Sequence, residues 1–134
     1  MDTYAWSAQL LKPSWAPPSW LFGPVWTILY AIIAVTFGTV FYQAFTKRIP
    51  RIVALPFVLN LAFNFAFTPI QFGLKNNILA SIDILLILGT LIWALYAIWH
   101  ASPKLRWIAY ANIPYLAWVS FATYLQLTVT YLNA

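Results

Sequence analysis

Apolar residues fall into four long runs along the chain, and short polar turns separate each run from the next. The runs cover about residues 24–45, 52–72, 78–99 and 107–132. Each has at least the roughly 20 residues that an α-helix needs to cross the hydrocarbon core of a bilayer. The pattern therefore predicts four transmembrane helices.

Prolines within these runs are compatible with membrane helices. Pro24 stands at the first turn of its run, where the missing amide donor costs nothing. Pro56, Pro69 and Pro114 lie inside their runs, and membrane helices tolerate such prolines when neighbouring groups satisfy the freed carbonyls. We expect each helix to continue through its proline.

The first 23 residues differ from the rest, because they mix polar and aromatic residues. Lys12-Pro13 and Pro17-Pro18 exclude a continuous helix here, since each proline removes an amide donor and restricts the residue before it. We predict an interfacial lead-in and a loop rich in Trp and Pro over residues 1–23. The chain as a whole, 1–134, is then a single transmembrane domain.

The composition agrees with a membrane environment. Hydrophobic residues make up 63% of the chain, charged residues only 7%, and the mean hydropathy is +0.80. Soluble domains carry about 25% charged residues, so this composition excludes a soluble domain. The expected fold is an all-α integral membrane bundle with the lipid bilayer as its partner. The chain contains no cysteine, which excludes disulfides and thiol chemistry.

The basic residues predict an orientation. The net charge of +5 is too scattered to indicate a nucleic-acid partner. Two bases, Lys12 and Lys75, belong to one side of the predicted bundle. The other side carries five, Lys47, Arg48, Arg51, Lys104 and Arg106. Since bases in short loops favour the cytoplasmic side, we predict that turns 47–51 and 100–106 are cytoplasmic and that both termini lie on the opposite side.

Polar residues inside the spans are the first candidates for function, because each is costly in hydrocarbon unless it finds a partner. Asn60, Asn64 and Thr68 recur every four residues and share one face of the second helix. They either join helices or contact a ligand. Asp83 is the sole acidic residue in any span. We expect it to face the bundle interior, to pair with polar groups and to serve a proton or a ligand.

Aromatic residues form a second group of candidates. In the last helix Tyr115, Trp118, Ala122 and Gln126 share one face, which is typical of helix packing and also of a site for flat ligands. The tryptophans near the first span are equally compatible with anchoring at the membrane interface. His100 stands alone in a turn, so we expect no metal site. The sequence shows no phosphate-binding loop, catalytic triad or carboxylate pair.

Three segments resemble the tryptophan-rich sensory protein and translocator protein family, known as TspO/MBR and including the peripheral-type benzodiazepine receptor. Residues 15–30 read WAPPSWLFGPVWTILY and are similar to its loop-and-helix signature. Residues 114–122 read PYLAWVSFA and match its last-helix motif. Residues 64–73, NFAFTPIQFG, are similar to a third motif, and Asp83 then falls at the family's acidic position without a gap. The resemblance covers about residues 12–133.

The resemblance implies a helical bundle whose cavity opens toward the first loop and binds porphyrins or heme, benzodiazepine-type ligands and, in some members, sterols. No obligatory cofactor is implied. The family's pocket positions fall on Trp15, Trp26, Tyr30, Asn60, Asn64, Trp118 and Ala122. Indole faces would stack on a flat macrocycle while amide groups would hold its polar edge.

Some features of the sequence depart from the family pattern. The family has five helices and this chain has four predicted spans, so its first helix is expected to be absent and the open groove to be closed by lipid or by a second copy in a homodimer. Asn60 stands where the family usually has Gln, and Phe67 where Trp is common. No base follows Arg106, so the sterol motif of some members is missing and sterol binding is not expected.

These observations favour a membrane protein that binds porphyrins or similar flat hydrophobic ligands for transport, sensing or stress response. Two alternatives remain. The first is an enzyme that promotes light- and oxygen-dependent porphyrin breakdown, with Trp26 and Trp118 as the reactive residues. The second is a structural or partner-binding membrane subunit. No residue is singled out here as catalytic.

Overall fold

The computed structural model describes residues 14–16, 19–70 and 76–133, and within them the chain is helical and contains no strand. The α-helices are α2 (Phe22–Phe45), α3 (Ala54–Thr68), α4 (Asn77–Ala101), α5 (Arg106–Ala111) and α6 (Ile113–Leu132). Short 3-10 turns precede three of them, η1 (Ser19–Leu21), η2 (Arg51–Val53) and η4 (Pro103–Leu105). The predicted all-α class is confirmed. Most of the predicted lead-in, residues 1–13 and 17–18, lies outside the described residues.

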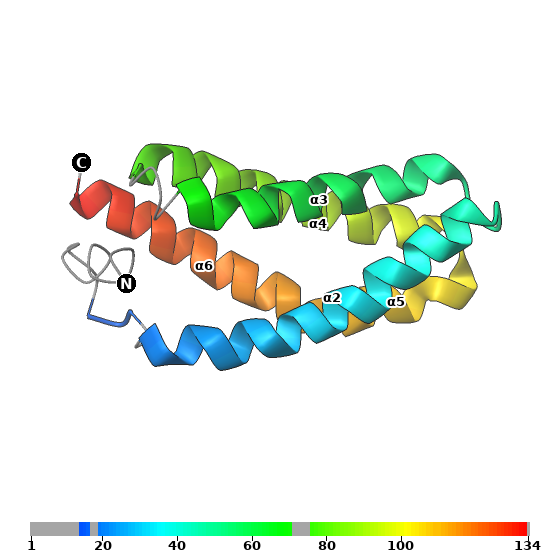
Figure 1. Ribbon diagram of the computed structural model, residues 1–134, viewed down its shortest axis with the longest axis horizontal. Helices are drawn as coiled ribbons and strands as arrows, with labels where there is room; N and C mark the ends of the chain where they lie inside the picture. Colours follow the sequence, from blue (N-terminus) through cyan, green and yellow to red (C-terminus); the bar gives the residue numbers. More distant parts are fainter. Residues whose placement is uncertain (1–13, 17–18, 71–75, 134) are drawn as a thin grey trace.

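The helices form an elongated bundle (Figure 1). α3 and α4 are antiparallel and pack along their length, and α6 packs on α4. α2 crosses the bundle obliquely and meets α3, η2 and α5. All buried residues of α2 lie at Leu29 or beyond it, so its first two turns pack more loosely than its second half.

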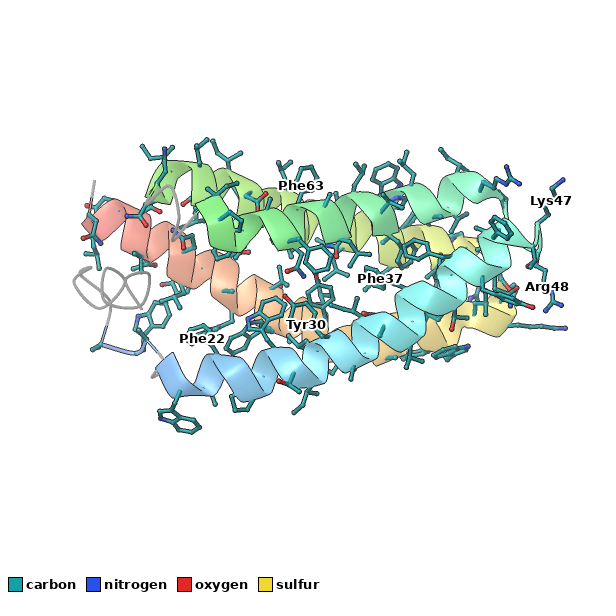
Figure 2. The ribbon with its side chains drawn as sticks, in the orientation of Figure 1. Phe22, Tyr30, Phe37, Lys47, Arg48 and Phe63 are labelled. Carbon is teal, nitrogen blue, oxygen red and sulfur yellow. The ribbon has the colours of Figure 1, made fainter. Side chains whose placement is uncertain are left out.

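The core is built from large side chains of several helices. Phe37 of α2 meets Phe57 of α3 edge-on at a centroid distance of 4.8 Å, and Tyr115 of α6 lies 6.4 Å from Phe37. All three are buried. Figure 2 shows Phe37 pointing from α2 toward the inside of the bundle. These rings fix where α2 crosses α3 and α6.

Two helix ends have identifiable local causes. α4 is capped by Asn76, whose side-chain oxygen accepts a hydrogen bond from the Leu79 amide at 2.9 Å. α2 ends in a Schellman motif, in which the Arg48 amide donates to the Gln43 carbonyl at 2.9 Å and the Lys47 amide donates to the Ala44 carbonyl at 3.1 Å. Lys47 takes the left-handed conformation with φ of 63°.

The last predicted span, 107–132, is not one helix in the structure. It is interrupted at Asn112, between α5 and α6. Pro114 has no amide proton to donate to the Tyr110 carbonyl, which weakens the helical ladder at this point. The Asn112 side chain instead donates to the Ile108 carbonyl at 2.8 Å and to the Thr36 hydroxyl of α2 at 3.0 Å. The expectation that the helix continues unbroken through Pro114 was wrong.

The second span also ends earlier than its predicted limit at residue 72. α3 ends at Thr68, and a wider helical turn follows at Pro69 and Ile70. Pro69 cannot donate to the Phe65 carbonyl, so the regular ladder does not continue past it. Residues 71–75, which include Lys75, lie outside the described residues.

The surface of the bundle suits hydrocarbon. By length and composition α2 and α4 are able to cross a membrane, with mean hydropathies of 1.8 and 2.4 in their most apolar stretches, and Arg51–Phe67 is a shorter apolar helix. Large apolar side chains are exposed around the helices, including Ile28, Val35, Phe45, Val58, Phe65, Ile82, Leu85, Ile92 and Leu127. A soluble monomer rarely exposes so much contiguous apolar surface.

Candidate ligand-binding site

A buried chain of hydrogen bonds joins α3, α4 and α6. The Tyr115 hydroxyl donates to Oδ1 of Asn60 at 2.8 Å and accepts from Nδ2 of Asn64 at 2.9 Å. Nδ2 of Asn60 donates to the Ile87 carbonyl at 2.9 Å and to the Thr90 hydroxyl at 3.2 Å. Every donor among these hydrogen bonds has a defined acceptor, so the direction of each bond is fixed.

The local sequence explains this arrangement. Asn60 and Asn64 lie one turn apart on α3, so both side chains reach the single hydroxyl of Tyr115. Asn60 is completely buried and Asn64 is 6% exposed. Asn60 uses both its amide group and its carbonyl oxygen to connect helices. This is the first of the two roles, joining helices or contacting a ligand, that the sequence left open. Asn64 makes its bond through the amide group.

Two aromatic side chains of α2 cover this polar chain. Trp26 lies edge-on to Tyr115 at a centroid distance of 6.3 Å, and Tyr30 lies 5.3 Å from Trp26. Tyr30 also approaches Phe65 of α3 at 6.4 Å. In Figure 2 Tyr30 projects from α2 toward the other helices. The amide groups of α3 and the rings of α2 therefore meet at Tyr115.

A second aromatic group covers the outer part of α6. Trp118 is edge-on to Phe22 of α2 at 5.5 Å and lies 5.7 Å from Phe121. Trp15, from the loop before α2, stacks on Tyr124 at 5.1 Å with an interplanar angle of 5° and meets Phe121 edge-on at 5.8 Å. The loop and the start of α2 are thus joined to α6 through aromatic rings.

An open apolar groove runs between α2 and α6. Its volume is about 520 Å³, and its lining side chains are Leu21, Val25, Ile28, Leu29, Pro114, Ala117, Trp118 and Phe121. Pockets of about 300–1,000 Å³ are typical of small-molecule sites. The indole nitrogen of Trp118 is buried and has no hydrogen-bond acceptor among the described residues. This side chain therefore borders the groove and carries an unused donor.

The predicted site residues sort into two adjoining groups. Trp26, Tyr30, Asn60 and Asn64 gather around Tyr115, whereas Trp15 and Trp118 belong to the second group. Ala122 is half-buried on α6 and has no side-chain group that could bond to either.

The prediction did not include all residues that organise these groups. The omitted side chains are Phe22, Phe121 and Tyr124, whereas Tyr115 was a candidate on the last helix but was not assigned to the ligand pocket. Phe121 stands inside the recognised last-helix motif and Phe22 inside the loop signature, so these two residues could have been found from the motifs. Tyr124 lies beyond the motif and was not detectable, because only the fold shows that Trp15 reaches it.

Asp83 differs from the other polar candidates. It lies in α4 with 5% of its surface exposed, so it faces the interior. Its Oδ2 atom is buried and has no hydrogen-bond partner among the described residues. The polar partner that we expected for this oxygen is therefore not found in that part of the chain.

Comparison with known proteins confirms the resemblance seen in the sequence. Residues 1–132 match the TspO/MBR family. The tryptophan-rich protein TspO of Bacillus cereus is 37% identical over 128 residues, covering 96% of this chain and 80% of its own. TspO of Chlorobaculum tepidum is 33% identical over 92% of this chain and 77% of its own.

A eukaryotic relative gives a similar result. The translocator protein of Homo sapiens is 36% identical over 126 residues, covering 92% of this chain and 72% of its own. Coverage of nearly the whole chain at these identities identifies the family, and the helical bundle with its apolar surface agrees with it. The chain therefore belongs to the TspO/MBR family and is a helical-bundle membrane protein.

Proposed function

We propose that the protein binds porphyrins or similar flat hydrophobic molecules in the membrane and acts in their transport or sensing. The observation that supports this most directly is that two aromatic groups lie beside the first half of α2. Trp26 and Tyr30 form one group, and Trp15 and Trp118 belong to the other. An apolar groove adjoins the second group.

The chemistry of these groups suits a flat amphipathic ligand. Indole and phenol rings favour stacked or edge-on contacts with another π-system. A porphyrin also carries polar substituents at its edge, and these require hydrogen-bond partners when the ring is buried. The indole N–H of Trp118 is a buried donor without an acceptor among the described residues, and it would have to turn toward the groove to reach a ligand. The Asn64–Tyr115 hydrogen bond lies next to Trp26, which meets Tyr115 edge-on. Apolar walls and a few polar groups together give affinity and orientation.

We further propose that the chain crosses the membrane four times, through α2, α3, α4 and the combined α5–α6 segment. The bases of turns 47–51 and 100–106 would then be cytoplasmic and both termini would lie on the opposite side. Figure 1 is compatible with this order, because α2 begins and α6 ends at the same end of the bundle.

The proposed ligand site is tested by adding protoporphyrin to the purified protein in detergent and following tryptophan fluorescence. We expect saturable quenching, because the macrocycle would lie beside several indoles. Replacing Trp26→Ala or Trp118→Ala should each remove stacking worth about 1 kcal/mol, which weakens binding roughly fivefold. Trp93→Ala is the matched control, since Trp93 lies on α4 and is 44% exposed, away from both aromatic groups.

The same titration separates the alternatives. Equal affinity in all three variants would show that the rings serve packing alone and would refute the site. A carrier or sensor returns the porphyrin unchanged under light and oxygen. An enzyme would convert it to a product with a bilin-like absorbance, and the two tryptophan variants would then lower the rate of conversion.

A further inference from the structure

All basic residues that the structure describes gather at one end of the bundle. Three lie between α2 and α3, one lies between α4 and α5, and one is the first residue of α5, namely Lys47, Arg48, Arg51, Lys104 and Arg106. Figure 2 shows Lys47 and Arg48 at this end, opposite the end where α6 terminates. The two turns are neighbours, because η2 contacts α4 and α2 contacts α5.

No acidic residue neutralises this end within the described part of the chain. Asp83 is the sole acid there, and it lies in the half of α4 that is farther from the basic turns. Lys47, Arg48, Arg51 and Lys104 are exposed. The charge of this end is therefore both uncompensated and accessible.

Aromatic rings hold two of the guanidinium groups in place. Arg106 donates from Nε to the Trp99 carbonyl at 3.0 Å, and its guanidinium carbon lies 4.6 Å from the centroid of the Trp99 ring. The guanidinium carbon of Arg48 lies 5.9 Å from the centroid of the Tyr42 ring. These contacts reduce the conformational freedom that each arginine would lose on binding an anion. The terminal nitrogens of Arg106 have no hydrogen-bond acceptor among the described residues. They are planar donors suited to phosphate oxygens.

We propose that this end is a binding site for the phosphate headgroup of an anionic phospholipid, held between the two basic turns. A phosphate tethered to a lipid suits the site better than a free phosphate ion, because exposed apolar and aromatic side chains surround the bases. Phe45, Ile52 and Trp107 are exposed next to them and would contact the glycerol and upper acyl region. This inference is independent of the proposed porphyrin site, which lies toward the other end of α2.

The test is a lipid titration of the purified full chain in detergent, followed by thermal unfolding. Phosphatidylglycerol should raise the unfolding temperature saturably, whereas phosphatidylcholine, which carries no net charge, should not. Arg106→Lys keeps the net charge but loses the planar fork held by Trp99. Arg48→Gln should weaken the response to phosphatidylglycerol roughly fivefold, since it loses the attraction of one base near an anionic surface. Arg106→Lys should also weaken the response, because lysine cannot form two parallel hydrogen bonds with a phosphate.

Controls decide whether the effect is specific to this end and to lipid. Lys75→Gln removes one charge from the sequence between α3 and α4 and should respond to phosphatidylglycerol like the parent. Glycerol phosphate should fail to stabilise the protein at equal concentration. An equal response of all variants would overturn the site, and equal stabilisation by glycerol phosphate would overturn the lipid as its source. If a variant unfolds too readily for this assay, native mass spectrometry of retained lipid supplies the same comparison.

Discussion

Lys47 adopts the left-handed backbone conformation that closes α2, with φ of 63°. A residue with a Cβ is strained there, whereas glycine is not. Lys47→Gly should therefore stabilise the folded chain by about 1 kcal/mol, the strain removed less the greater freedom of glycine in the unfolded chain. Thermal unfolding in detergent without anionic lipid measures this gain and avoids the effect of the lost charge on lipid binding.

The neighbouring residue provides the control for Lys47. Thr46 has φ of −85°, a conformation open to any residue, and its hydroxyl donates to the Tyr42 carbonyl at 2.8 Å. Thr46→Gly should lower the unfolding temperature. If both glycine variants lower it, the left-handed position is not strained and the argument fails.

Asp83 makes a different prediction. Because buried Oδ2 has no hydrogen-bond partner among the described residues, its desolvation is uncompensated there, at a cost of about 1–3 kcal/mol. Asp83→Leu should raise the unfolding temperature, and Asp83→Asn, which keeps a polar group of the same size, should not. A less stable Leu variant would reveal a partner for the carboxyl group. Protoporphyrin titration of the Leu variant then shows whether the carboxyl group also serves the ligand.

At the scale of residues, the sequence predicted which face carries Asn60 and Asn64 but not what they contact. Helical spacing places both amides on one side of α3. It contains no information about the rotation and register of α6, which bring the Tyr115 hydroxyl between them. The same limit applies to Trp15, whose stacking on Tyr124 depends on how the loop folds back over α6.

At the scale of elements, the Asn60–Tyr115 bond joins α3 to α6, and Asn60 in turn joins α4. A double-mutant cycle with Asn60→Leu and Tyr115→Phe isolates its contribution. We expect each single change to destabilise the bundle. The pair should show a coupling energy between about 0.6 and 1.7 kcal/mol, the average and the maximum measured for hydrogen bonds between membrane helices. Denaturant unfolding in mixed micelles provides the measurement.

A matched cycle on Asn60 and Thr123 serves as the reference. Thr123 is also buried, but its hydroxyl donates to the Val119 carbonyl of its own helix at 2.7 Å. Thr123→Val should therefore be additive with Asn60→Leu. Strong coupling in both cycles would mean that the substitutions disturb helix packing generally, and the value for the Asn60–Tyr115 bond would have no specific meaning.

The break between α5 and α6 shows why helix limits were less predictable than helix existence. The apolar run 107–132 is continuous, so hydropathy alone predicts one helix. Pro114 marks a weak point, but whether the chain bends there depends on a tertiary partner. That partner is Thr36 of α2, which accepts the hydrogen bond from Asn112 at 3.0 Å.

At the scale of the whole molecule, the proposed topology is tested with reporter fusions. A reporter that is active only in the cytoplasm should work when inserted within residues 47–51 and fail when fused after Ala134. A reporter active only outside the cytoplasm should give the reverse pattern. The expectation follows from four crossings and the basic residues of the two turns. If the turn and the C-terminus lie on the same side, the number of crossings between them is even and the proposed topology is wrong.

The general architecture was accessible from composition and hydropathy, because helices are the structures that satisfy every backbone group inside a single apolar segment. The oblique course of α2 could not be predicted from composition and hydropathy. It depends on the edge-on packing of Phe37 and Phe57 and on the Asn112–Thr36 bond, which hold the second half of α2 while its first turns stay less packed. Neither contact has a signature in spacing.

The groove between α2 and α6 has a consequence for how binding constants should be interpreted. Ile28 on its wall is 62% exposed, so the groove opens sideways toward the hydrocarbon and not only toward water. A hydrophobic ligand that enters by this route first partitions into the bilayer. The occupancy of the groove then depends on the mole fraction of the ligand in lipid. Diluting the same protein and ligand with more lipid should therefore weaken the apparent affinity in proportion. Affinities for this chain are therefore comparable only at equal lipid-to-protein ratios.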